Sequence, residues 1–371
     1  MRFLLLSFLL ILQIPSFSQK PRPRELGIEF GILKTGNLNA ITDVPGVKVG
    51  HFTLHQGTDI HTGVTAILPI EENIFQNKVP AAIYIGNGFG KLAGYTQVEE
   101  LGNIETPILL TNTMVVSTAI DALIDFTIQN PENKTVKSVN AVVGETNDGG
   151  LNDIRARVLT KENMLEAIAS ANSGKVAEGN VGAGTGTMSL GFKGGIGTSS
   201  RILPISKGGY TVGVLVQSNF GGVLQIGGKP IGQLLGNYKF KNIDKEYEED
   251  GSCMMVVITD APLNAKNLKR LAARAMLGLS RTGGMAANGS GDYVIALSTA
   301  KDLRIAHDSK EMYETFKVLR NNDLDLLFQG VVEATEEAII NSLFAAEDLQ
   351  GFNGYKAEAL PIKTVMELLK K

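Results

Sequence analysis

The sequence is poor in several kinds of residue, and each shortage excludes a class of protein. Its 371 residues include one cysteine and no tryptophan. A single cysteine cannot form an internal disulfide or a cysteine-rich zinc site. Neither sign of charge dominates, because 35 lysines and arginines stand against 38 aspartates and glutamates, for a net charge of −3. A basic footprint for nucleic acid is therefore missing, and we expect no nucleic-acid partner.

Long apolar runs are also missing, apart from one at the N-terminus. Residues 3–12 are apolar except for one serine and follow an arginine. This run is too short to span a bilayer, and Ser16 and Ser18 supply the small residues typical of a signal-peptidase site. We expect residues 1–18 to be a signal peptide, with an uncleaved membrane anchor as the alternative. The mature protein would begin near Gln19, carry no membrane segment and be periplasmic or secreted.

Glycine, in contrast, is abundant. The chain has 42 glycines in 371 residues, whereas roughly 7% is usual. They follow no repeat, and 43% of the residues are hydrophobic, so the glycines belong to a folded body with many tight turns and close backbone approaches. The length predicts one large domain or two fused ones.

The apolar pattern predicts a mixed α/β protein. Short apolar runs bounded by glycine, asparagine or aspartate are typical of buried strands, and they lie at residues 81–86, 107–111, 138–144, 210–216, 253–258 and 293–297. Apolar residues at three- and four-residue spacing indicate helices at residues 115–128, 263–279, 323–345 and 360–369. Asn264 is the expected N-cap of the second helix.

The sharpest change of character lies between residues 239 and 252, where the charged segment KFKNIDKEYEED gives way to GSCMMVVIT. One interpretation is an ordinary surface loop that enters a strand. The other is a processing site between Gly251 and Ser252, because glycine has no Cβ to hinder a strained backbone. Attack of the Ser252 hydroxyl on the Gly251 carbonyl would give an ester, which water would cleave. Ser252 would then carry a free α-amine that can act as a base beside its own hydroxyl.

Two neighbouring segments offer supporting side chains. Ser290 and Asp292 precede the predicted strand at residues 293–297 and share one face of an extended run, where they could orient Ser252 and carry its proton. The alternative is a turn in which the aspartate caps backbone amides. Asn219 follows the predicted strand at residues 210–216 and suits an oxyanion donor, or else it only supports the glycine turn beside it.

These segments resemble motifs of the self-processing L-aminopeptidase/D-esterase and β-peptidyl aminopeptidase family. The resemblance runs in the family's order from about residue 41 to residue 297, which is more specific than any single motif. Its segments are ITDVPGVKVGH at 41–51, GETNDG at 144–149, GAGTG at 182–186, QSNFG at 217–221, GSCM at 251–254, TDAPL at 259–263, RA at 274–275, GLSRTG at 278–283 and NGSGD at 288–292.

The resemblance implies an α/β fold built as a four-layer αββα sandwich, similar to N-terminal-nucleophile hydrolases but with its own strand connectivity. It also implies autocleavage between Gly251 and Ser252. Residues 19–251 would become an α-subunit and residues 252–371 a β-subunit, together forming one catalytic domain. A homotetramer of such αβ units, without cofactor or metal, is the assembly that the resemblance implies.

The resemblance also assigns site residues. Matched residue by residue, it gives Ser252 as the nucleophile, Ser290 and Asp292 as its supporting pair, Asn219 as the oxyanion donor and Glu145 as the carboxylate that holds the substrate's free amine. The chain departs from some relatives in two places. Asp292 stands where they have glutamate, so its reach is shorter by about one methylene, and Asn147 stands where they have an aromatic residue, which alters the pocket.

The activity predicted from these residues is that of an exported aminopeptidase, amidase or esterase. It would release the N-terminal residue of small peptides, aminoacyl amides or esters through a seryl acyl-enzyme. One alternative is an acyltransferase of the related ornithine-acetyltransferase type, which uses threonine as its nucleophile. The other is a non-catalytic binding protein that keeps the fold without processing.

Other features receive ordinary interpretations. His51, His55 and His61 lie close together, but no second ligand group accompanies them, so we expect core or solvated histidines rather than a metal site. The glycine-rich residues 182–197 lack the G-K-[ST] ending of a phosphate loop and are expected to line the cleft or abut a neighbouring subunit.

Two further expectations concern single side chains. Cys253 adjoins the predicted nucleophile, and its apolar neighbours predict a buried small residue rather than a second nucleophile. Glu336 and Glu337 are expected on an exposed helix face.

Overall fold

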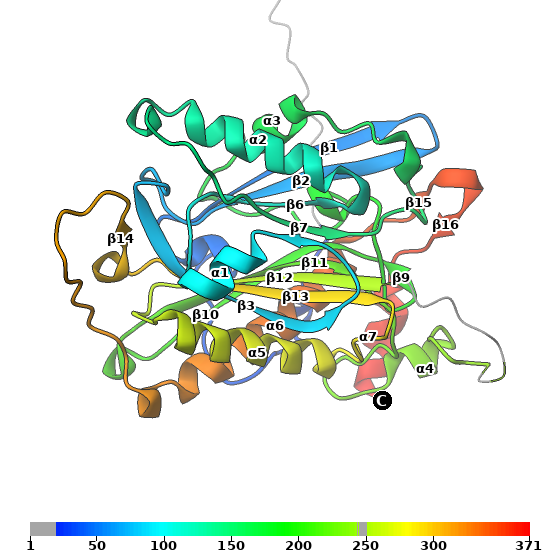
Figure 1. The fold of residues 1–371 in the computed structure, drawn as a ribbon. Helices are drawn as coiled ribbons and strands as arrows, with labels where there is room; N and C mark the ends of the chain where they lie inside the picture. The colour runs from blue at the N-terminus through cyan, green and yellow to red at the C-terminus, as the bar shows by residue number, and fades with distance from the viewer. Residues whose placement is uncertain (1–19, 243, 245–250) are drawn as a thin grey trace, which may run out of the picture.

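The computed structural model describes residues 20–242, 244 and 251–371. The predicted signal peptide therefore lies outside the described residues. Two stacked sheets form the centre of the molecule, and helices cover the outer face of each sheet (Figure 1). No helix in the described ranges is long and apolar enough to cross a bilayer.

The first sheet has the strand order β1-β2-β6-β7-β4. Its strands are β1 (Lys48–Gln56), β2 (Ile60–Leu68), β6 (Ile108–Asn112), β7 (Val142–Thr146) and β4 (Leu92–Ala93). Helices α2 (Val116–Ile128) and α3 (Lys161–Ala169) lie over its outer face (Figure 1). β1 is antiparallel to β2, and β2 is antiparallel to β6. β6 and β7 are parallel.

The second sheet has the order β10-β11-β12-β13-β3-β14, with β5 (Asn103–Ile104) paired to β3. Its strands are β10 (Gly195–Ile202), β11 (Thr211–Asn219), β12 (Gly251–Thr259), β13 (Ser290–Ser298), β3 (Asn77–Gly88) and β14 (Ile305–Ala306). Helices α5 (Ala265–Arg281) and α6 (Asp325–Ala345) cover its outer face (Figure 1).

Smaller elements complete the fold. They are α1 (Tyr95–Leu101), α4 (Ile231–Leu235), α7 (Ile362–Lys370), the β8–β9 hairpin (Met188–Ser189 and Phe192–Lys193) and the β15–β16 hairpin (Leu349–Gln350 and Lys356–Ala357).

Three hydrophobic cores separate the four layers. One core contains Leu109 of the first sheet and Leu123 of α2. A second lies between the sheets, and a third contains Val257 of β12 with Leu271 of α5. Burial on both faces explains why β12 is almost continuously apolar. Its residues face the first sheet and the covering helices alternately. The predicted αββα sandwich is confirmed.

The predicted strands and helices are present, with ends that differ by a few residues. Asn264 caps α5 as expected, because its side chain accepts a hydrogen bond from the Asn267 N–H at 3.1 Å. The exposed position expected for Glu337 is wrong. It is buried, and its carboxylate accepts hydrogen bonds from Arg201 at 2.7 Å and from Arg24. The reason is that α6 is packed between β10 and α5, so it has little solvent-exposed face.

Candidate active site

Ser252 lies at the beginning of β12, where three strands of the second sheet meet. It pairs with Asn219 at the end of antiparallel β11 and with Gly291 near the start of parallel β13. The residue is buried, with 4% of its surface exposed. The register, which the sequence could not fix, therefore brings residues 219, 252 and 291 into one row.

The Ser252 hydroxyl contacts the peptide group that precedes it. Its Oγ lies 2.5 Å from the Gly251 carbonyl oxygen, to which it donates a hydrogen bond, and it accepts one from the Gly291 N–H at 3.3 Å. Glycine is required at position 291, because a Cβ there would lie 2.9 Å from the Phe89 carbonyl oxygen and 3.3 Å from Ser252 Oγ. The hydroxyl is thus held against the carbonyl that it would have to attack.

Ser290 and Asp292 share one face of β13, as predicted, but that face is not the one that carries the Ser252 side chain. Ser290 pairs with Gly251 and Asp292 pairs with Cys253, and paired residues project to the same side of a sheet. Cys253 packs in the core below helices α5 and α6. The Ser290 side chain therefore flanks the 251–252 peptide from the helix side, while the Ser252 hydroxyl points toward the first sheet.

Asp292 and Ser290 are buried polar groups without ordinary partners. Among the described residues, neither the Asp292 carboxylate oxygens nor the Ser290 hydroxyl has a hydrogen-bond partner of standard geometry. Burial raises the pKa of Asp292 from 3.8 to about 6, although the nearby Ser290 hydroxyl and Cys253 backbone act in the opposite direction. Burying polar groups without partners lowers the stability of the fold. Groups of this kind with shifted pKa values are typical of functional sites.

The Asn219 side chain is fixed at both ends. Its Oδ1 accepts a hydrogen bond from the Met188 N–H at 2.9 Å, and its Nδ2 donates to the Asn147 carbonyl at 2.9 Å. One N–H of the amide has no partner among the described residues. Because Asn219 is paired across the sheet with Ser252, this amide group lies on the same face as the serine hydroxyl.

Glu145 reaches the site from the first sheet. Its carboxylate accepts hydrogen bonds from the Lys91 N–H at 2.8 Å and from the Thr113 hydroxyl. Only 2% of the residue is exposed, and no lysine, arginine or histidine forms an ion pair with it in the described part of the chain. A buried carboxylate without a cation is unfavourable unless something cationic binds to it.

A second glycine allows this approach of one sheet to the other. A Cβ at Gly144 would lie 2.4 Å from the Met254 Cε on β12. With only hydrogen there, β7 and β12 pack closely at this point, which is adjacent in sequence to Glu145 on β7 and two residues from Ser252 on β12.

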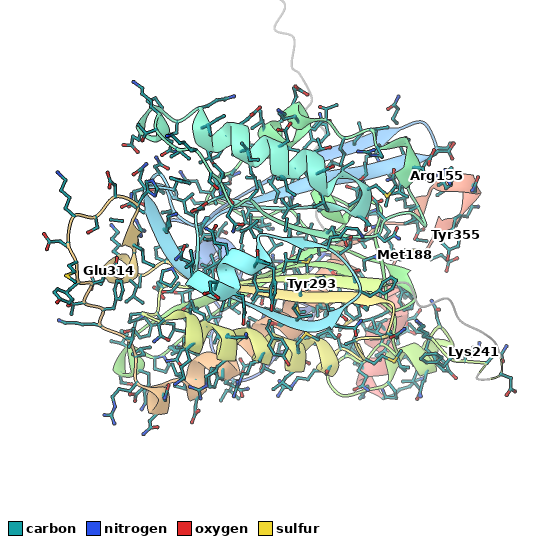
Figure 2. All side chains as sticks on the ribbon, in the orientation of Figure 1. Arg155, Met188, Lys241, Tyr293, Glu314 and Tyr355 are labelled. Carbon is teal, nitrogen blue, oxygen red and sulfur yellow. The ribbon has the colours of Figure 1, made fainter. Side chains whose placement is uncertain are left out.

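One cavity is lined by Ser252, and a larger one is lined by its cross-strand partner Asn219. The small cavity, of 270 Å³, is lined by Ser252, Gly251, Glu145, Asn147, Thr113, Gly289 and residues 88–91. The large cavity, of 750 Å³, is lined by Asn147, Asn219 and residues of the β8–β9 and β15–β16 hairpins, among them Met188 and Tyr355, both labelled in Figure 2. Residues 188–192 of the glycine-rich segment therefore line a cavity beside the predicted nucleophile, as expected.

The three histidines bond to their neighbours. His51 Nδ1 lies 3.0 Å from Thr65 Oγ1, and His55 Nδ1 lies 2.8 Å from His61 Nδ1. Burial lowers the pKa of His51 to about 4. Across the described residues, no group of three or more histidine, cysteine, aspartate or glutamate side chains is arranged to hold a metal ion. Cys253 is buried, as predicted.

The sequence did not point to Lys193, a fully buried lysine in β9. Its Nζ donates hydrogen bonds to the carbonyls of Gly184 at 3.0 Å and Gly194 at 2.8 Å. Burial lowers its pKa to about 7, an effect that the buried carboxylate of Asp148 opposes. A lysine followed by two glycines in the sequence looks like a solvated turn residue, so only the packing identifies it.

This burial predicts how stability changes with pH. Between about pH 7 and 10.5 the unfolded chain keeps the Lys193 proton and the folded chain does not, so the free energy of unfolding should rise with pH. For one proton the rise is about 1.4 kcal/mol per pH unit. Urea unfolding from pH 7 to 9.5 should show this rise in the wild type relative to Lys193→Met. A constant difference between the two proteins across that range would contradict the prediction.

The chain is similar to known proteins along most of its length. A model of Peptidase family S58 matches residues 39–357. The chain is 40% identical over 383 residues to the beta-peptidyl aminopeptidase BapA of Sphingosinicella microcystinivorans, covering 95% of this chain and 93% of that protein.

Two solved structures are similar along nearly the whole chain. A beta-aminopeptidase from Burkholderia sp. is 38% identical with a TM-score of 0.86, covering 94% of this chain and 98% of that one. The L-aminopeptidase D-Ala-esterase/amidase from Ochrobactrum anthropi, described as a new variant of the Ntn-hydrolase fold, is 35% identical with a TM-score of 0.87, covering 95% of this chain and 98% of that one. The chain therefore belongs to peptidase family S58, and it is a serine-type aminopeptidase.

Proposed function

We propose that this aminopeptidase is activated by cleavage of its own chain between Gly251 and Ser252 and then releases N-terminal residues from peptides, aminoacyl amides or esters. The observation that carries the proposal is a single cavity shared by Ser252, Gly251 and the Glu145 carboxylate, which has no ion-pair partner in the described part of the chain. A hydroxyl nucleophile and an unpaired anion a short way apart suit a substrate with a protonated amine next to the bond that is cut.

Activation takes two steps. Ser252 Oγ forms a bond to the Gly251 carbonyl carbon, the C–N bond breaks, and the hydroxyl proton moves to the nitrogen. Water then hydrolyses the ester, leaving a carboxylate on Gly251 and a free amine and hydroxyl on Ser252. The 2.5 Å contact between the hydroxyl and the Gly251 carbonyl group supports this route.

Turnover uses the same hydroxyl. Glu145 holds the substrate's ammonium group, which positions the first carbonyl beside Ser252. The serine attacks, the N–H of Asn219 that is without a partner stabilises the oxyanion, and the leaving amine or alcohol departs with a proton. Water hydrolyses the acyl-enzyme and releases the amino acid.

Ser290 and Asp292 would act through the new α-amine of Ser252 rather than through its hydroxyl. Ser290 pairs with Gly251, so it lies beside the peptide nitrogen that becomes the amine. The amine takes the proton from the hydroxyl on the other face of the strand, and the Ser290–Asp292 pair stabilises the ammonium that results.

The carboxylate form of Asp292 is therefore needed, and it is lost as the pH falls through about 6. Asp292→Asn should lower kcat by about 10²- to 10⁴-fold and remove the part of the acid limb centred near pH 6. The profile of kcat/KM between pH 5 and 9 on an aminoacyl p-nitroanilide measures this. An unchanged limb together with an unchanged kcat would refute the role of Asp292.

The proposal extends to the whole assembly. Residues 1–18 are proposed to direct export to the periplasm or outside, and the processed units are proposed to form a homotetramer. The test of the function is electrophoresis under denaturing conditions together with hydrolysis of an aminoacyl amide in the presence of a nucleophilic amine. Fragments matching residues 19–251 and 252–371, with free amino acid as the main product, are expected. An uncut chain without hydrolysis, or dominant transfer to the amine, would overturn it.

A further inference from the structure

The Asn219 amide is oriented by two backbone groups from segments outside its own strand. Its Oδ1 accepts a hydrogen bond from the Met188 N–H, and its Nδ2 donates one to the Asn147 carbonyl. Met188 begins β8, and Asn147 directly follows β7. The direction of the remaining N–H of the amide therefore depends on where these two segments lie.

A buried aspartate holds the segment that contains Asn147. Asp148 is the next residue, and only 2% of its surface is exposed. Its carboxylate accepts hydrogen bonds from the Thr62 hydroxyl at 2.6 Å and from the Asn152 side chain at 3.0 Å. Because Thr62 is on β2, the carboxylate ties the peptide group between residues 147 and 148 to the first sheet.

A buried lysine holds the segment that contains Met188. Lys193 pairs with Met188 across the β8–β9 hairpin, and its Nζ donates hydrogen bonds to the carbonyls of Gly184 and Gly194. The Gly194 N–H in turn donates to the Thr187 carbonyl at 3.0 Å, which belongs to the same peptide group as the Met188 N–H. The lysine thus ties this peptide group to the glycine-rich segment at residues 182–187.

The two side chains interact with each other and lie away from the substrate. Burial raises the pKa of Asp148 from 3.8 to about 6, against its hydrogen bonds and the charge of Lys193. Neither residue is among those that line the small or the large cavity. Burying a lysine and an aspartate is less favourable than burying apolar residues of similar size, so stability alone does not account for them.

We propose that Lys193 and Asp148 are positioning residues, which hold the two backbone partners of Asn219 and so direct its remaining N–H toward the oxyanion. The inference rests on the proposed function, in which Asn219 is the oxyanion donor. The charge of the lysine is not required, since a neutral amine keeps two N–H groups for its two carbonyl partners. The pair acts on the chemical step rather than on substrate binding.

The kinetic test uses the processed full-length enzyme and an aminoacyl p-nitroanilide, with each rate divided by the fraction of chain that is cut. Lys193→Met and Asp148→Asn should each lower kcat by about 10- to 100-fold, as a small misplacement of a catalytic group does, and should change KM by less than about twofold. Asn219→Ala should lower kcat by about 10²- to 10³-fold. Adding Lys193→Met to Asn219→Ala should lower kcat no further, because the lysine acts through that amide. A further loss of 10-fold or more in the double variant would overturn the inference.

Lys78→Met is the matched control. Lys78 is also largely buried and pairs with Glu105, and neither residue lines the two cavities. This variant should lose stability and keep the wild-type kcat. A fall in its kcat equal to that of Lys193→Met would show that loss of any buried lysine has this effect, and would overturn the inference.

A second measurement does not depend on activity. In crystal structures of Lys193→Met and Asp148→Asn, the Asn219 amide should have lost at least one of its bonds to Met188 and Asn147. An unchanged amide in both variants would overturn the inference, whether or not the chains are cut. Asp148→Asn keeps the size of its side chain, so it carries the test if Lys193→Met does not fold. A wild-type kcat in Asn219→Ala would instead refute the oxyanion role in the proposed function.

Discussion

Ser252→Ala is expected to remain a single uncut chain and to lose hydrolytic activity by about 10⁴-fold or more, as removal of a serine nucleophile does elsewhere. The same Oγ serves both reactions in the proposed mechanism, so both must disappear together. Alanine is smaller and fits the position, and among the described residues the serine side chain makes hydrogen bonds only to the adjacent Gly251 carbonyl and the Gly291 N–H. Denaturing electrophoresis and p-nitroanilide release measure the two losses.

The control is a buried serine at the far end of the neighbouring strand. Ser298 is on β13, in the same sheet, and its hydroxyl donates a hydrogen bond to the Ala261 carbonyl at 2.6 Å. Ser298→Ala should lower stability by about 1 kcal/mol but should still be cut and active. Two fragments or retained hydrolysis in Ser252→Ala would remove the serine from the mechanism.

Glu145→Gln should lower kcat/KM by about 10²- to 10³-fold for substrates with a free amine, because a buried charge pair would lose one partner. The variant keeps the size of the side chain, and its amide oxygen can still accept from the Lys91 N–H, while its NH2 group would donate to the Thr113 hydroxyl, which donates to the wild-type carboxylate. Its preference for free over N-acetylated aminoacyl p-nitroanilides should shrink by a similar factor. Cleavage of the chain itself should continue, since that step involves no substrate ammonium.

Glu105→Gln supplies the matched control. Glu105 is buried to a similar degree, at 4% exposed, but it pairs with Lys78 away from both cavities. That variant should lose stability rather than selectivity. An equal fall in kcat/KM for free and acetylated substrates in Glu145→Gln would mean that the carboxylate supports the structure rather than the substrate's amine.

The sequence predicted which segments form strands and helices far better than it predicted which strands pair with each other. β12 was visible because both of its faces are buried, which makes it a continuous apolar run. β1 and β10 were not, since His51 and His55 interrupt one and glycines and serines fill the other. Such strands owe their position to pairing with the rest of a sheet, which no local pattern records.

The site shows the same division. A charged loop meeting an apolar strand pointed to Ser252, and motif resemblance pointed to Glu145. That the two line one cavity depends on how the two sheets stack, and that Ser290 lies on the other face of the strand from the serine hydroxyl depends on register. Both are contacts between segments distant in sequence, so only the folded chain could reveal them.

The position of β12 and β13 has a consequence for the cut protein. Both strands follow the proposed break, yet they are inserted between β11 and β3, which precede it. Helix α6, also after the break, packs on β10 and β11 from before it. The two pieces are thus woven through one sheet and share two of the hydrophobic cores. Loss of the peptide bond after Gly251 would leave these shared contacts in place. The cut protein should therefore unfold in a single transition, and neither piece should stay folded alone.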